Sequence, residues 1–348
     1  MGRPDAPGGA AVFAPGSLFV IGEYAVLHGG RALLAAVDSG IECRVAPHAD
    51  GWWLSAPDLG VDAPLDDVPR DHGARLLVEA VRAGRTAFAG PGPLHVTVRG
   101  HGWGAGRKLG LGGSAASVVA VLGALAAAAG HDVSSTVLRR ALLPAAVDVH
   151  RAHQHGRGSG GDVAASLHGG WVGYRTAHGT PHAEPATVPP GLRLAVAWSG
   201  IACDTAAGID RFHRLGAKAE VDGFVAALTT ELDRFWAASR DADWPAYRGA
   251  ISAYGALLED LARRIAPQQA ERMARLTHAA TDCGATAKSS GAVGGDCVIA
   301  VGTDGAPLAD ARTAWRRLGA VPLDVALDAE GLRTVRPEES GESWRDQD

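Results

Sequence analysis

This 348-residue chain has no excess of positive charge. Lys and Arg together number 33 against 38 Asp and Glu, the formal net charge is −5, and no basic run exceeds two or three residues. Proteins that bind nucleic acid or an anionic membrane surface need clustered basic side chains. The sequence therefore predicts neither a nucleic-acid partner nor a membrane partner.

Cysteines are few, and long apolar runs are absent. The four cysteines form no C-x-x-C pair, which predicts reduced thiols rather than a disulfide framework or a zinc site: Cys43, Cys203, Cys283 and Cys297. The opening residues, "MGRPDAPGGAAVFAPG", lack the charged and then apolar order of a signal peptide. The longest apolar run, Ser117–Ala129, is too short to span a bilayer. These absences predict a soluble, cytoplasmic protein.

The chain length and the mixture of local patterns predict two domains of α+β structure. Strand patterns such as "LHVTVR" (Leu94–Arg99) alternate with helical patterns such as Ser114–Ala129, which is apolar on all sides and should be buried. A proline-bearing stretch, Pro181–Pro190, is the best candidate for a domain boundary. We therefore expect an N-terminal domain over 1–188, a C-terminal domain over 189–337 and a flexible tail over 338–348.

A glycine-rich loop, "KLGLGGSAAS" (108–117), leads directly into the apolar helix. Glycines at 110, 112 and 113 leave the backbone bare, so its N–H groups could approach an anion at the start of the helix. Close packing of a helix also favours glycine, and neither the P-loop pattern nor G-x-G-x-x-G is present. The loop alone therefore leaves packing and phosphate binding as open alternatives.

Three other segments carry clustered polar residues and glycines. They are "APGSLFVIGEYAVLHGG" (14–30), "HRAHQHGRGSGGDVAASLHGG" (150–170) and "KSSGAVGGDCVIAV" (288–301). Together with the glycine-rich loop they resemble, in order and spacing, the motifs of the GHMP kinase superfamily. Within it, "GEYAVL", "GSGGDVAAS" and "WSGIACDT" (198–205) are most similar to the phosphomevalonate kinase branch.

This resemblance implies a two-domain α+β fold of the GHMP kinase type, with the active site in the cleft between the domains. It implies ATP and Mg²⁺ as cofactors and a small-molecule acceptor, phosphomevalonate, which would become diphosphomevalonate. The ATP phosphates would contact residues 110–115, with Ser114 as the Mg²⁺ ligand: Gly110, Leu111, Gly112, Gly113, Ser114 and Ala115. Asp162 and Lys108 would be catalytic. The acceptor would contact Ser17, Glu23, Tyr24, His150, Arg157, Ser159, Gly160, Ser199, Ser290 and Gly291.

The chemistry of the acceptor decides what Asp162 must do. An alcohol acceptor needs a base, and Asp162 is the obvious carboxylate. A phosphate acceptor is already ionised near neutral pH, so it needs nearby cations more than a base. We expect those cations from one cluster of side chains: Lys108, His150, His153, His155 and Arg157.

One position departs from the family pattern in a way that affects catalysis. Ser17 stands where the first family motif has a lysine close to the transferred phosphoryl group. Either Lys108 or Arg157 supplies the missing charge, or the enzyme is slow, or the chain is a retired nucleotide-binding protein. Mevalonate kinase is the alternative within the same class. For Asp296 the sequence leaves two readings open, a functional role or a cap or brace of the third glycine-rich loop. The sequence carries no signal for an oligomeric state.

Overall fold

The computed structural model describes residues 9–69, 71–88, 92–101 and 109–335, so Lys108 and the predicted tail lie outside the described residues. The strands are β1 (Ala10–Ile21), β2 (Ala32–Pro47), β3 (Trp53–Ala56), β4 (Val61–Pro64), β5 (Leu94–His101), β6 (Trp171–Ala177), β7 (Thr180–Pro185), β8 (Arg193–Trp198), β9 (Thr286–Ser290), β10 (Cys297–Gly302), β11 (Val321–Leu323) and β12 (Arg333–Thr334). The helices are α1 (Arg75–Ala87), α2 (Gly113–Ala128), α3 (Thr136–His153), α4 (Gly161–His168), α5 (Thr205–His213), α6 (Lys218–Asp241), α7 (Trp244–Ile265), α8 (Pro267–Asp282) and α9 (Gly305–Arg317), and two short 3₁₀ helices span Ala25–His28 and Pro57–Leu59.

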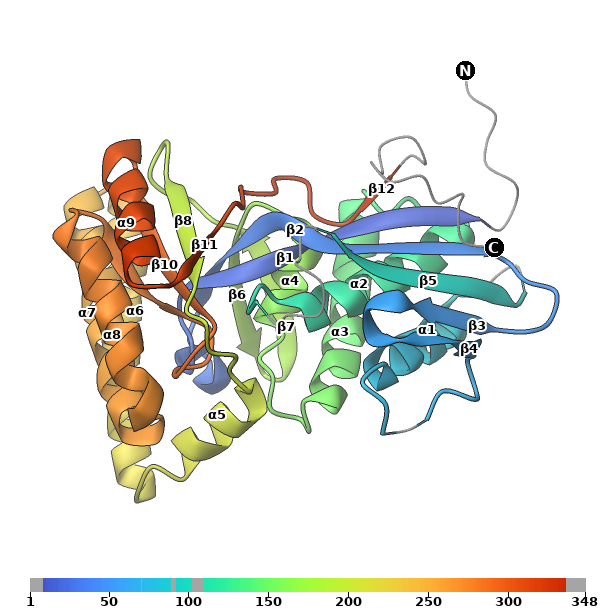
Figure 1. Ribbon diagram of the computed structural model, residues 1–348, viewed down its shortest axis with the longest axis horizontal. Coiled ribbons are helices and arrows are strands. Elements are labelled where there is room, and N and C mark those ends of the chain that lie inside the picture. The colour runs from blue at the N-terminus through green and yellow to red at the C-terminus, as the bar shows by residue number, and fades with distance from the viewer. Residues whose placement is uncertain (1–8, 70, 89–91, 102–108, 336–348) are drawn as a thin grey trace.

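The larger sheet is built mainly from the first half of the chain. Its strand order is β12-β1-β2-β5-β3-β4, with β6 on β2 and β7 on β6, and the β3–β5 pair is parallel. Helix α2 packs against β1 and β2 on one side and contacts α1, α3 and α4 (Figure 1). Neighbours on every side explain why this helix is apolar all round. The prediction of a buried helix over 114–129 is confirmed.

The smaller sheet is antiparallel, with strand order β11-β8-β10-β9. Helices α8 and α9 contact its strands, and α7 packs on β9 and against α6 (Figure 1). Apolar side chains at helical spacing supply this core: Phe224, Leu228, Leu232 and Phe235 from α6, and Leu258, Leu261 and Ile265 from α7. Both sheets are largely antiparallel and have helices packed against them, which confirms the α+β class.

Part of the proline-bearing stretch is a strand rather than a linker. Residues Thr180–Pro185 form β7, which pairs with β6 alone. Proline lacks an N–H donor and is tolerated at the edge of a sheet, which is where β7 lies. The boundary near residue 188 stays a prediction.

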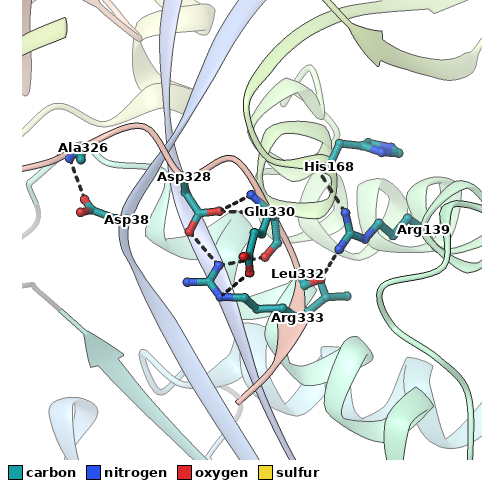
Figure 2. A network of polar contacts seen from close by, with 9 residues as sticks. Asp38, Arg139, His168, Ala326, Asp328, Glu330, Leu332 and Arg333 are labelled. Atoms are coloured by element: carbon teal, nitrogen blue, oxygen red, sulfur yellow. Dashed lines mark hydrogen bonds and ion pairs between the residues drawn. The ribbon is translucent and has the colours of Figure 1, made fainter. Parts of the chain in front are cut away.

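After β11 the chain returns to the larger sheet through residues 326–335, here called the return segment (Figure 2). Asp38 donates its backbone N–H to Ala326 O (3.0 Å) and accepts the Ala326 N–H on Oδ1 (2.8 Å). Asp328 accepts a hydrogen bond from Arg333 (2.7 Å), and Arg139 of α3 donates to Leu332 O. The return segment thus joins the end of the described chain to β1, β2 and α3. No helix among the described residues is long and apolar enough to cross a membrane.

Candidate active site

A cavity of about 590 Å³ lies where loops from the two sheets and their helices meet. Its walls come from β1, the loops before α2, α4 and α5, the last turn of α3 and the loop after β9. The predicted site residues that line it are Ser17, Glu23, Tyr24, Gly110, Leu111, Gly112, Gly113, Ser114, His150, Ser159, Gly160, Asp162, Ser290 and Gly291. The cavity therefore brings together segments on both sides of the predicted domain boundary.

The glycine-rich loop packs closely against its neighbours. Gly110 and Gly112 have φ values of +75° and +70°, a left-handed backbone that favours glycine. A Cβ on Gly112 would lie 2.2 Å from Ser17 Oγ, and one on Gly110 would lie 2.3 Å from the Asp296 Cβ. The Ser17 N–H also donates to Leu111 O (2.9 Å). Close packing is therefore one reason for these glycines.

The same loop also presents unbonded backbone donors to the cavity. Helix α2 begins at Gly113 after the left-handed Gly112, and no side chain in the described part of the chain caps it. The first N–H groups of a helix have no intrahelical acceptor, and they carry the positive end of the helix dipole. This terminus has the properties of an anion site. Packing and anion binding are thus compatible uses of one loop.

Asp162 lies in the first turn of α4, beside Ser17. The Ser17 hydroxyl donates to Asp162 Oδ1 (2.8 Å). Burial raises the pKa of Asp162 to about 6, although the Ser17 hydrogen bond lowers it, and the Glu23 carboxylate raises it further. A carboxylate with that proton affinity is mostly ionised at neutral pH and can serve as a base.

Ser114 and His150 also line the cavity and form a hydrogen-bonded pair. Ser114 Oγ and His150 Nε2 are 2.9 Å apart. Burial, followed by the charge of His153, lowers the pKa of His150 to about 4, and burial also lowers the pKa of His153. His150 is therefore neutral near pH 7, and the expectation that it supplies positive charge is wrong. Its geometry makes it a hydrogen-bond partner for Ser114.

A buried ion pair joins the first motif to the third. Lys288 Nζ donates to Glu23 Oε1, and neither side chain is more than 3% exposed. Tyr24 makes a parallel connection, since its hydroxyl accepts the Val293 N–H (3.2 Å). The hydroxyl of Ser290 donates to a backbone oxygen of β1 (2.9 Å). These contacts fix the third loop against the turn after β1.

Three predicted site residues in the described part of the chain do not line this cavity. Ala115 is buried inside α2, and Ser199 is fully buried just after β8. Arg157 forms an ion pair with Asp210 of α5, so its charge is partly neutralised. Lys108 lies outside the described residues.

Two residues at the site, Lys288 and Asp204, were not predicted to have their observed roles. Lys288 belongs to the motif "KSSGAVGGD", but its pairing with Glu23 could not be seen from the motif alone. Asp204 caps α5 by accepting the Ala207 N–H (3.0 Å), and it lines the cavity. Asp296, which has a left-handed φ of +54°, accepts the Cys203 N–H (2.9 Å) and so ties the third loop to the segment before α5.

The oxygen donors around the cavity fit a magnesium ion. Ser114 and Asp162 line the cavity, and buried Glu23 Oε2 has no hydrogen-bond partner among the described residues. Mg²⁺ prefers oxygen ligands and is commonly held by one or two carboxylates together with substrate phosphates. A Ser114 hydroxyl that donates to His150 would turn its lone pairs toward such an ion.

Comparisons with known proteins bear on this arrangement. Residues 75–170 match the family model for the N-terminal domain of GHMP kinases. A phosphomevalonate kinase from Streptomyces sp. (strain CL190) is 29% identical over 373 aligned positions, covering 92% of this chain and 97% of that protein. A mevalonate kinase from Aeropyrum pernix is 29% identical over 200 positions, covering 55% of this chain and 58% of that protein.

A solved structure shares the whole fold. The phosphomevalonate kinase of Streptococcus pneumoniae, in complex with phosphomevalonate and AMPPNP, superposes with a TM-score of 0.76 at 21% identity. The match covers 93% of this chain and 99% of that one. The α+β fold expected from the sequence motifs is therefore confirmed, and the division into two domains stays a prediction.

Proposed function

Because the chain belongs to the GHMP kinase superfamily, we propose that it transfers the γ-phosphoryl group of ATP to phosphomevalonate, giving ADP and diphosphomevalonate. One observation carries this proposal. The uncapped N-terminus of α2 and the Ser17–Asp162 pair line the same cavity, where a transferring phosphoryl group would need both. Phosphoryl transfer depends mainly on positioning and on electrostatic stabilisation, which these groups supply.

The ATP phosphates would bind along residues 110–114. Their oxygens would accept hydrogen bonds from the backbone N–H groups at the start of α2. Ser114, with Asp162 and Glu23 nearby, would hold the Mg²⁺ ion that accompanies ATP. When bound, that ion would offset negative charge on the phosphates.

The acceptor phosphate would enter from the side of α4. This helix also begins after a left-handed glycine, Gly160, and the Ser159 hydroxyl accepts the Gly161 N–H (3.1 Å). Two helix N-termini on one cavity give partial positive charge on both sides of the reacting groups. The two termini would partly offset the repulsion between two anions and the acidic side chains of the cavity wall.

Mevalonate kinase is the second candidate, and the proton affinity of Asp162 favours it. A carboxylate with a pKa near 6 matches the task of taking a proton from an alcohol. With phosphomevalonate the attacking oxygen is already ionised, so Asp162 would orient Ser17 and balance charge rather than remove a proton.

A coupled assay of ADP release tests the proposal. The purified chain is given ATP and Mg²⁺ with phosphomevalonate, with mevalonate, or with no acceptor, and the products are identified by ³¹P NMR. We expect turnover with phosphomevalonate and a new diphosphate signal. Preference for mevalonate would establish the second candidate. ATP binding without turnover of either acceptor would establish a nucleotide-binding protein that has lost kinase activity.

A further inference from the structure

Asp296 stands immediately before β10 in a backbone conformation that few side chains adopt. Its φ of +54° is left-handed, a region in which aspartate and asparagine are enriched among the residues other than glycine. Its side chain is buried and lines the cavity of the candidate active site. A sparsely populated conformation persists only where the surrounding contacts hold it in place. The contacts of Asp296 therefore indicate what this position does.

Three hydrogen bonds join Asp296 to residues 199–204, which lie between β8 and α5 and are here called the β8–α5 connection. Asp296 donates its backbone N–H to Ile201 O (2.6 Å), and its backbone oxygen accepts the Ser199 N–H (2.8 Å). Its Oδ1 accepts the Cys203 N–H (2.9 Å). The connection ends where α5 begins, at a wall of the cavity. Asp296 therefore fixes this wall to the end of the third motif.

Asp296 and Cys297 also contact the beginning of the glycine-rich loop. A Cβ on Gly110 would lie 2.3 Å from the Asp296 Cβ, so the aspartate side chain packs directly on the backbone of the loop. The Cys297 thiol, which is fully buried, donates to Leu109 O (3.0 Å). Because α2 begins at Gly113, a shift of this loop also moves the backbone N–H groups at the start of the helix.

We propose that Asp296 is a positioning residue for phosphoryl transfer, which holds the glycine-rich loop and the β8–α5 connection at a fixed separation across the cavity. The inference rests on the proposed function, in which the loop binds the ATP phosphates and the acceptor occupies the same cavity. Transfer between two bound molecules depends on their alignment, and small displacements are costly. A carboxylate repels phosphate, so the contribution of Asp296 lies in its contacts rather than in its charge.

Calorimetric binding of AMPPNP with Mg²⁺ tests the inference without any turnover. Asp296→Gly keeps the left-handed backbone and removes the side-chain contacts, whereas Asp296→Asn keeps an oxygen acceptor for the Cys203 N–H and removes the charge. Asp304→Gly is the matched control, because the exposed Asp304 follows the other end of β10 and also accepts a backbone N–H, that of Ala306 (3.0 Å). Amide hydrogen exchange of the glycine-rich loop and of the β8–α5 connection is measured on the same proteins.

We expect Asp296→Gly to weaken AMPPNP binding roughly 10-fold, as for one lost hydrogen bond and its packing, and to speed hydrogen exchange in both segments. Asp296→Asn should bind AMPPNP within roughly 3-fold of the wild type, and Asp304→Gly should bind it as the wild type does. Wild-type binding by Asp296→Gly would overturn the inference. Asp296→Asn binding as weakly as Asp296→Gly would also overturn it, because the effect would then belong to the charge.

A double-mutant cycle tests the same contact from the side of the loop. Gly110→Ala should weaken AMPPNP binding because its Cβ meets Asp296, and the loss should be smaller in the Asp296→Gly background, where the obstructing side chain is gone. Equal losses in the two backgrounds would overturn the inference. If Asp296→Gly does not fold, Gly110→Ala alone decides, since normal AMPPNP binding by that variant would show that the contact does not position the loop. The expected changes in AMPPNP binding without any turnover of phosphomevalonate by the wild type would contradict the proposed function alone.

Discussion

Replacing Asp162 with asparagine should stabilise the protein at neutral pH while lowering its activity. Burial raises the pKa of this carboxyl group from 3.8 to about 6 in the folded protein. The folded state therefore binds more protons than the unfolded state between these values, and its stability falls as the pH rises through them. Above about pH 7 the penalty is complete, at about 3 kcal/mol, since each pKa unit is worth about 1.4 kcal/mol.

Asparagine removes this penalty and keeps an oxygen that can accept the Ser17 hydrogen bond. We expect the gain in free energy of unfolding to be smallest near pH 4 and about 3 kcal/mol at pH 7.5. Urea unfolding of both proteins at several pH values measures it, with Asp260→Asn on the exposed side of α7 as the control. Parallel pH profiles for wild type and Asp162→Asn would refute the reasoning. Turnover of an alcohol acceptor should fall by ~10²-fold or more, and that of a phosphate acceptor by less.

Three further predictions concern packing around the site. Gly112→Ala should cost about 1–3 kcal/mol of stability and weaken ATP binding, because the added Cβ would collide with Ser17 and alanine would have to adopt a left-handed φ. Thermal unfolding with and without ATP measures both effects. Unchanged values would contradict the need for glycine at this position. Lys288→Met should lower the free energy of unfolding in urea by about 3–5 kcal/mol, because it leaves the buried Glu23 carboxylate unpaired. Adding Glu23→Gln to this variant should recover part of the loss. Normal stability of Lys288→Met alone would refute the pairing. Asp328→Ala should lower the free energy of unfolding by at least about 2 kcal/mol, because two backbone N–H groups and an arginine lose their acceptor. The KM for ATP should be unchanged, and a change in KM alone would point to a role at the site.

Patterns of apolar residues along the sequence predicted which helices of the fold are buried. The helix α2 could be recognised because a helix that is apolar on every face must be buried, and its neighbours lie on every side. On α6 and α7 apolar residues recur at helical spacing, which predicts one buried face on each helix. The strand β7 was missed because its prolines suggested a linker, and only its pairing with β6 shows that it lies at an edge.

The site was predictable as a set of motifs, but its electrostatics were not. The first and third motifs do not reveal that Glu23 and Lys288, which are 265 positions apart, pair in the interior. Nor does the sequence show that His150 is buried, which makes a residue expected to be cationic neutral. Charge state depends on burial and partners, and both are properties of the tertiary structure.

Ser17, which stands in place of the family lysine, removes a positive charge and also changes the surroundings of Asp162. Of the cations proposed to compensate for the family lysine, Arg157 is paired with Asp210 and does not line the cavity that Ser17 lines, so Lys108 is the candidate that remains. Ser17 meanwhile bonds Asp162 through its hydroxyl and the glycine-rich loop through its N–H. A lysine beside Asp162 would lower the pKa of that carboxyl group, whereas a serine leaves burial to raise it. The serine therefore changes the proton affinity of Asp162 as well as the charge near the phosphoryl group. Unfolding of the wild type and of Asp162→Asn, measured across pH, reports on the proton affinity of Asp162 without any turnover.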